Sequence, residues 1–345
     1  MSDLIAGNFF QILAAAFFVG IVVGLTGMGG GALMTPALIF LGVGDASTVV
    51  TADLTAAAVY KTGGAVVHSR HGQPNFALAK WLILGSVPMA FLGPFLVKRF
   101  TDPTNIETTL QLAIGVALLF AATTYALRLY IGLRQRRRGT HATGEPRIRP
   151  VPTILVGALG GLLVGITSVG SGSVIMVALL MMYPTLTAVR LVGTDLVQAV
   201  PLVLSAAVAN ILAHGLDWSI TIPLIIGSLP GSMLGARLAP RVPQSVIRRG
   251  IVIVLTMSGV ALLDKAGWAP LGKTETHPMF VAFVGLAMLV LVPLVWGILR
   301  KTEGLTFFGH PTVREIEHDL GTGDRPAPDS EPAPKSEPAP ESESA

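Results

Sequence analysis

The stretch GLTGMGGGALMTP, residues 24–36, places five glycines between Gly24 and Gly31 inside a strongly apolar part of the chain. Apolar runs flank these glycines on both sides, near 9–26 and 31–42. Glycine weakens a helix, and irregular backbone inside a bilayer is tolerated only where protein buries it or where it lines a polar cavity. The stretch therefore predicts a broken membrane helix beside a cavity.

The composition of the 345 residues is that of a polytopic membrane protein. Hydrophobic residues make up 51% and charged residues only 13%, whereas soluble domains average about 25% charged residues. The chain has no cysteine, which excludes disulfides, thiolate metal sites and cysteine nucleophiles. Its seven histidines show no metal-binding spacing, so we expect neither a metal nor a cofactor. The N-terminus lacks a positive segment, and we expect no cleaved signal peptide.

Eleven apolar segments follow one another, and the two halves of the chain repeat. GLTGMGGGALMTPAL aligns with GITSVGSGSVIMVAL, so that Gly24 matches Gly165 and, further on, Asp53 matches Asp195. Matched apolar segments interrupted by glycine in two halves are the sequence signature of a transporter binding site. The segments lie near 9–26, 31–42, 48–67, 76–97, 107–131, 151–168, 173–184, 187–213, 219–236, 248–263 and 279–299.

The distribution of basic residues favours inverted repeats. When each glycine-broken pair is a re-entrant hairpin, fifteen loop arginines and lysines fall on one side of the membrane and four on the other. When each pair crosses once, this bias nearly disappears. The positive-inside rule then places the N-terminus outside, and the basic loop and the acidic tail in the cytoplasm. The predicted fold is all-α, with two inverted repeats that each contain a re-entrant pair and about three transmembrane helices, plus one extra C-terminal helix.

The predicted domain organisation follows from these segments. The first transmembrane repeat covers 1–131, the basic cytoplasmic loop 132–150 and the second repeat 151–263. An extra loop and a C-terminal transmembrane helix cover 264–301. Residues 302–345 are rich in Pro, Glu and Ser, cannot bury a core, and are expected to be disordered.

The glycine breaks predict an anion site. A new half-helix starts after each break, at about Ala32 and about Ser173, and a helix N-terminus offers free N–H groups and a positive dipole end. In inverted repeats the two N-termini converge near the midplane. Ser171 and Ser173 can cap the second half-helix or donate to the ligand. The predicted substrate-binding residues are Thr26, Gly27, Gly29, Gly30, Gly31, Thr167, Ser168, Gly170, Ser171, Gly172 and Ser173.

Four glycines elsewhere in the spans are interpreted as packing residues. The ionisable residues within the spans are candidates for coupling transport to another ion. Gly85, Gly93, Gly227 and Gly235 predict close packing of membrane helices. Charged side chains inside a span are functional candidates. The coupling or supporting candidates are Asp53, Asp195, Lys61 and Thr194. The aspartates either bind a coupling proton or brace the half-helices, unless they are carboxylates in interfacial water, and Lys61 either complements the anion or snorkels to the interface.

The chain resembles the sulfite exporter TauE/SafE family of membrane permeases. The resemblance rests on GLTGMGGGALMTPALIFLGV in the first half, and on GITSVGSGSVIMVALLMMYPTLTAVRLVGTDL and HGLDWSITIPLIIGSLPGSMLGARLAPRV in the second. It implies a secondary carrier in the cell (inner) membrane, not an enzyme, whose partner is a small anion such as sulfite, a sulfonate or thiosulfate. It implies no nucleic-acid partner, and it leaves a homodimer open. Serines at 171 and 173 replace glycines of the family pattern.

Two alternatives remain open at the level of sequence. Gly170-Ser171-Gly172 at a helix N-terminus can supply a nucleophile and oxyanion donors, with His214 as the base of an intramembrane serine hydrolase. The first repeat has Gly30 where the second has Ser171, so the duplicated architecture does not require a nucleophile. The same half-helices can also line an anion channel.

Overall fold

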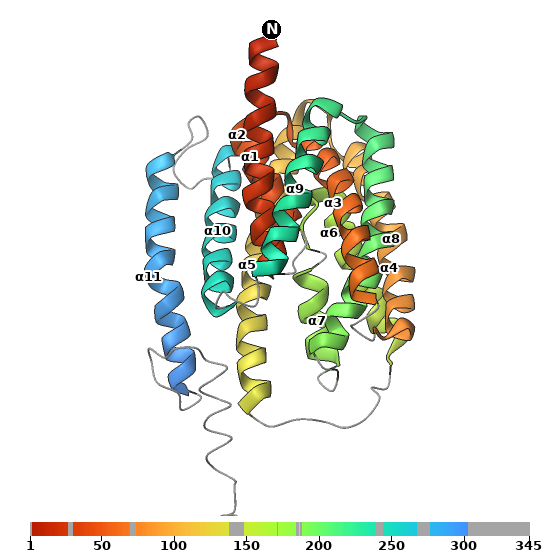
Figure 1. The fold of residues 1–345 in the computed structure, drawn as a ribbon, viewed down its shortest axis with the longest axis vertical. Helices are drawn as coiled ribbons and strands as arrows, with labels where there is room; N and C mark the ends of the chain where they lie inside the picture. The colour runs from red at the N-terminus through yellow and green to blue at the C-terminus, as the bar shows by residue number, and fades with distance from the viewer. Residues whose placement is uncertain are drawn as a thin grey trace, which may run out of the picture. The chain divides into compact units, whose positions relative to one another are not determined.

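The computed structural model describes residues 2–26, 30–69, 74–137, 148–170, 172–183, 186, 188–238, 244–267 and 277–302. Every regular element among them is a helix, which confirms the predicted all-α class (Figure 1). Residues Met1–Phe307 form one compact unit. The helices are α1 (Ser2–Thr26), α2 (Gly31–Leu41), α3 (Ala46–Ser69), α4 (Phe76–Phe100), α5 (Ile106–Arg137), α6 (Pro150–Thr167), α7 (Val174–Met182), α8 (Ala188–His214), α9 (Trp218–Leu238), α10 (Gln244–Lys265) and α11 (Pro278–Thr302), with a short 3-10 turn at Pro103–Asn105.

Seven of the described helices are long and apolar enough to cross a membrane. Large apolar side chains point outward from them, among them Phe18, Leu159 and Phe283, which are 66%, 65% and 68% exposed. Such surfaces are stable in lipid and not in water. The predicted multi-pass membrane protein is therefore confirmed. The spanning ranges are Phe9–Thr26, Phe76–Phe100, Pro103–Leu127, Pro150–Thr167, Gly193–His214, Trp218–Leu238 and Pro278–Thr302.

One predicted boundary differs from the structure, and one prediction lies almost wholly outside the described residues. Helix α5 continues to Arg137, past the predicted end at residue 131, because the arginines and glutamine of this stretch are good helix formers. The predicted basic loop of 132–150 therefore begins within a helix. The predicted disorder of 302–345 falls almost wholly outside the described residues, which end at Thr302.

Each short helix folds back along the long helix that precedes it. Helices α2 and α7 have 11 and 9 residues, or about 16 and 14 Å at 1.5 Å per residue, which is half of a bilayer core. The hydroxyl of Tyr183, just after α7, lies 2.7 Å from Thr153 Oγ1 and accepts the N–H of Arg149 at 3.0 Å, so the end of α7 returns to the start of α6. In the first half, Val23 of α1 contacts Gly30 before α2.

The long helices pack in exchanged pairs between the two halves. Helix α1 packs along α9, and α4 packs along α6; α3 meets α8, and α5 meets α10. Under the sequence alignment α1 corresponds to α6, and α9 to α4, so each of these contacts has its counterpart. The extra helix α11 packs on α10 at the edge of the bundle (Figure 1). This arrangement supports the predicted repeat.

Glycines allow the exchanged pairs to approach closely. A Cβ built on Gly157 of α6 would lie 2.6 Å from the carbonyl oxygen of Leu82 on α4, and one on Gly231 of α9 would collide with the carbonyl of Phe17 on α1. The packing role predicted for four glycines is therefore correct. The glycines in such interhelical contacts include Gly85, Gly93, Gly161, Gly165, Gly227 and Gly235.

We predict that Gly231→Ala destabilises the protein. The added methyl group has to push α9 away from α1, and overpacking of this kind costs about 1–3 kcal/mol. The melting temperature of the purified protein in detergent should fall by several degrees. Gly250→Ala on α10 is the matched control, because a Cβ there meets nothing within 4 Å. An equal melting temperature for both variants would contradict the close α1–α9 contact.

Candidate functional site

The two glycine breaks meet inside the bundle. Helix α1 ends at Thr26 and α2 begins at Gly31, while α6 ends at Thr167 and α7 begins at Val174. A Cβ built on Gly31 would collide with the backbone carbonyl and the hydroxyl of Ser168. Only a residue without a side chain allows this approach. The start of one short helix therefore lies directly against the break of the other half.

The backbone of the second break needs an unusual conformation. Ser168 has φ 60° and Gly170 has φ 123°, so the chain leaves α6 through the left-handed region. The second value is accessible to glycine and is strained for other residues. Together the two residues turn the chain sharply enough for α7 to run back along α6.

A buried carboxylate joins the two breaks. Asp53 of α3 has no exposed surface. Its Oδ2 accepts the hydroxyl of Thr35 on α2 at 2.6 Å and the hydroxyl of Ser168 after α6 at 2.8 Å. Its Oδ1 is buried and has no hydrogen-bond partner among the described residues. One carboxylate oxygen thus binds both halves of the protein, and the other is unused.

Two further charged residues lie near this carboxylate. Lys61 of α3 is 9% exposed and interacts electrostatically with both Asp53 and Asp195. Asp195 of α8 is 7% exposed, and its Oδ1 accepts the Nε2 of Gln198 at 3.0 Å. The alternatives of an interfacial carboxylate and of a snorkelling lysine are therefore wrong, because all three charged side chains are inside the bundle.

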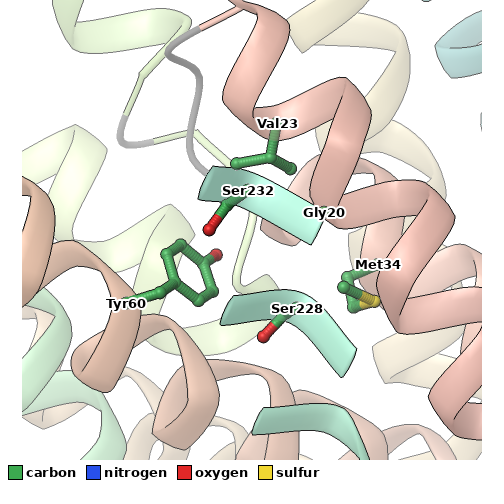
Figure 2. Close-up of a pocket in the computed structure, with 6 residues that line it drawn as sticks. All are labelled: Gly20, Val23, Met34, Tyr60, Ser228 and Ser232. Atoms are coloured by element: carbon green, nitrogen blue, oxygen red, sulfur yellow. The ribbon is translucent and has the colours of Figure 1, made fainter. Parts of the chain in front are cut away.

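The hydroxyl of Tyr60 forms a hydrogen bond with one of the backbone N–H groups at the first break. It accepts the N–H of Gly30 at 3.0 Å. The ring borders a narrow crevice between α1, α2, α3 and α9, which has no room for a water molecule. Figure 2 shows the hydroxyls of Ser228 and Ser232 and the side chain of Met34 around it. The structure is therefore closed at this point.

The two halves differ beside their breaks. Gly160, on α6, is covered by the side chain of Ile175, to which a built Cβ would come too close. Asn210 of α8 donates its Nδ2 to the carbonyl oxygen of Gly165 at 2.8 Å. Where Tyr60 stands in the first half, the repeat alignment places Leu202 in the second. The second break thus has no counterpart of the Tyr60 hydroxyl at the equivalent position.

Two predicted binding threonines hydrogen-bond to carbonyls of their own helices. The hydroxyl of Thr26 donates to the carbonyl of Val22 at 2.8 Å, and that of Thr167 donates to Leu163 at 2.6 Å. The hydroxyls of these two equivalent threonines thus bind backbone carbonyls in the last turns of α1 and α6. Gly27, Gly29 and Ser171 lie outside the described residues.

The predicted cap of α7 is not formed by Ser173. Ser173 is buried directly before α7, but its side chain makes no capping hydrogen bond. Instead its carbonyl accepts the N–H of Val177 at 3.1 Å, and the carbonyl of Gly170 accepts the N–H of Val174 at 3.1 Å. Gly172 lies in the turn between them. The Ser173 hydroxyl is therefore a polar group at the start of α7 that does not cap the helix.

Thr194 connects α8 to another helix. Its hydroxyl oxygen accepts the N–H of Asn75, at the start of α4, at 2.9 Å, and its O–H donates to the carbonyl of Arg190 at 2.7 Å. Asn75 in turn caps α4 by accepting the N–H of Leu78 at 3.0 Å. The geometry of Thr194 is therefore that of a brace between helices.

The sequence analysis missed Thr35, Tyr60 and Gln198. Tyr60 and Lys61 follow Asp53 by seven and eight residues, which places all three on one face of a helix, and this spacing was the available signal. Gln198 follows Asp195 by three residues in the same way. Thr35 offered no such signal, because its contact crosses from α2 to α3.

Comparisons with known proteins give one family. A family model described as "Sulfite exporter TauE/SafE" matches residues 12–262. The chain is 33% identical over 254 residues to "Probable membrane transporter protein YjnA" of Bacillus subtilis (strain 168), covering 73% of this chain and 99% of that protein. It is 25% identical over 252 residues to "Probable membrane transporter protein YdhB" of the same organism, with the same coverage. No solved structure was found to match.

Proposed function

Because the chain belongs to the sulfite exporter TauE/SafE family, a family of membrane transporters, we propose that it is a secondary carrier of a small anion. The first candidates are sulfite and organosulfonates, followed by thiosulfate. The chain is a transporter and not an enzyme, so the alternative of a serine hydrolase built on Ser171 and His214 is set aside. The anion binds where the two glycine breaks meet.

The contact of Gly31 with Ser168 carries this proposal. It brings the start of α2, where backbone N–H groups lack helical partners, against the break that precedes α7 in the other half. Each helix start has a partial positive charge of about half a unit. Such donors bind an anion without an arginine cage.

A carrier fits the closed geometry better than a channel does. The crevice beside Tyr60 does not admit water, and Gly31 touches Ser168 without a gap for a side chain. A carrier opens alternately to each side, whereas an open pore needs a continuous polar path. Saturable, slow exchange of anion in liposomes is the expected behaviour, and unsaturable flux would indicate the channel.

The proposed topology is inverted, with the basic loop and the tail in the cytoplasm of a cell (inner) membrane. Tyr183 beside Thr153 supports a hairpin that enters and leaves on one side. Three long helices, α3 to α5, separate the two hairpins. An odd number of crossings puts the second hairpin on the face opposite to the first.

We predict anion flux that depends on the first break. Purified protein in proteoliposomes should exchange labelled sulfite or sulfoacetate, with competition by thiosulfate and little by short carboxylates. Gly30→Leu should reduce this exchange by more than about tenfold, the equivalent of 1.4 kcal/mol, because the side chain displaces the hydroxyl of Tyr60, 2.5 Å from a built Cβ.

The matched control is Gly250→Leu, which adds the same side chain to α10 where nothing lies within 4 Å. Both variants should elute as folded protein and melt within a few degrees of the parent. Wild-type flux in Gly30→Leu would show that the anion binds elsewhere. Absence of exchange for every anion in the parent would overturn the proposed function.

We also predict the sidedness of two engineered cysteines in this cysteine-free chain. A cysteine at Ser245, at the start of α10, should react with a membrane-impermeant maleimide only from the cytoplasmic side. A cysteine at Thr104, in the exposed turn before α5, should react only from the opposite side. Labelling of both from the same side would exclude inverted repeats.

A further inference from the structure

Asp53, which borders the proposed anion site, belongs to a set of three interacting buried charged side chains. Asp53, Lys61 and Asp195 are 0%, 9% and 7% exposed. Lys61 interacts electrostatically with both aspartates. With both carboxylates ionised, the cluster has a net charge of −1. An anion carrier therefore contains a negative cluster next to its proposed site.

This negative charge opposes anion binding. Buried charges without compensation cost several kcal/mol each, and ionisable groups inside a membrane are paired for this reason. Two helix starts together contribute about one positive charge, which only offsets the cluster. One donor of the first break, the N–H of Gly30, is also bonded to Tyr60. The anion therefore needs a further positive charge to enter, and a proton is the simplest source.

The structure identifies one oxygen that can take this proton. Oδ2 of Asp53 already accepts two hydroxyls, whereas Oδ1 is buried without a hydrogen-bond partner among the described residues. A proton on Oδ1 leaves both bonds to Oδ2 intact. The Oδ1 of Asp195, in contrast, has a donor in Gln198. Asp53 also contacts Ser168, at the break itself, at 2.8 Å.

Building on the anion transport proposed above, we propose that Asp53 binds the proton that travels with the anion. Oδ1 is protonated when the anion binds beside Ser168 and is deprotonated when the anion leaves. The proton removes one negative charge from the cluster and turns Oδ1 into an O–H donor for the anion. Anion and proton therefore cross the membrane in the same direction.

The ionisable groups around Asp53 are few. On α3 itself Lys61 and Tyr60 interact with it electrostatically, and Asp195 on the facing helix α8 is linked to it through Lys61. The described part of α2 and the break after α6 contain no ionisable side chain. The remaining described ionisable side chains of the helices packed against α3 are Arg190, His214, Arg237, Glu107, Tyr125 and Tyr130. The first four lie near helix ends, and Tyr125 is buried on α5.

The test separates exchange from coupled accumulation. Full-length protein in proteoliposomes is given labelled sulfite, or sulfoacetate where sulfite gives no exchange. Exchange is measured at equal pH on both sides, and accumulation is measured with an acidic exterior. The parent should accumulate the anion about tenfold per pH unit for one proton per anion in electroneutral transport. It should also take up protons when the anion is added.

Asp53→Asn should lose pH-driven accumulation and anion-dependent proton uptake, and its residual exchange should no longer depend on pH. Its amide is a permanent donor like the protonated acid, but it releases no proton. Asp217→Asn, at an exposed aspartate before α9, is the control and should keep both activities. Exchange without pH-driven accumulation in the parent would overturn the coupling and leave the proposed function standing. Persistent pH-driven accumulation in Asp53→Asn, or residual exchange that still follows pH as in the parent, would overturn the role of Asp53.

A second measurement uses the unaltered chain, so that its result does not depend on whether a variant folds. Dicyclohexylcarbodiimide modifies protonated carboxyls in apolar surroundings. It should modify Asp53 of the parent protein, faster at acidic pH and more slowly with saturating anion, as read by peptide mass spectrometry. A reaction at Asp53 that is independent of pH, or no reaction there, would contradict the proposal.

Discussion

The hydrogen bonds of Asp53 to Thr35 and Ser168 hold together the part of the fold on which the rest depends. Each half contains a helix that stops inside the bundle, and a stopped helix exposes backbone groups that lipid cannot satisfy. The structure buries both breaks against each other, with Gly31 on the backbone of Ser168. The carboxylate then joins them at 2.6 and 2.8 Å. Without this meeting point neither hairpin has a stable place.

The surrounding helices make this meeting possible. Both hairpins have a first arm long enough to span a membrane, yet their second arms turn back. Glycines allow α1 to pack closely on α9, and α6 on α4. The first arm of each hairpin therefore packs against a helix of the other half. The helices are therefore closely packed around the breaks. A conformational change that separates the halves would act first on the Gly31–Ser168 contact.

The sequence was sufficient for the fold class and for the position of the breaks. Periodic apolar runs gave the helices, and the predicted half-helix starts at about Ala32 and Ser173 lie within one residue of the observed Gly31 and Val174. It was not sufficient for the contacts of single side chains. The capping role of Ser173 failed because its backbone is in the right-handed helical region, with φ −110° and ψ −59°, rather than in the extended conformation typical of a capping residue. The role of Thr35 depends on how α2 packs on α3, which no local pattern encodes.

The most direct test is a cross-link between the two breaks. Thr35 and Ser168 donate to the same oxygen, so their hydroxyl oxygens lie no more than about 5.4 Å apart, within reach of a disulfide after small adjustments. In the cysteine-free chain, Thr35→Cys with Ser168→Cys should cross-link on mild oxidation and lose anion exchange, and reduction should restore it. The two single variants should transport before and after oxidation. A folded double variant that does not cross-link, or that transports at full rate while cross-linked, would contradict a transport site formed where the two breaks meet.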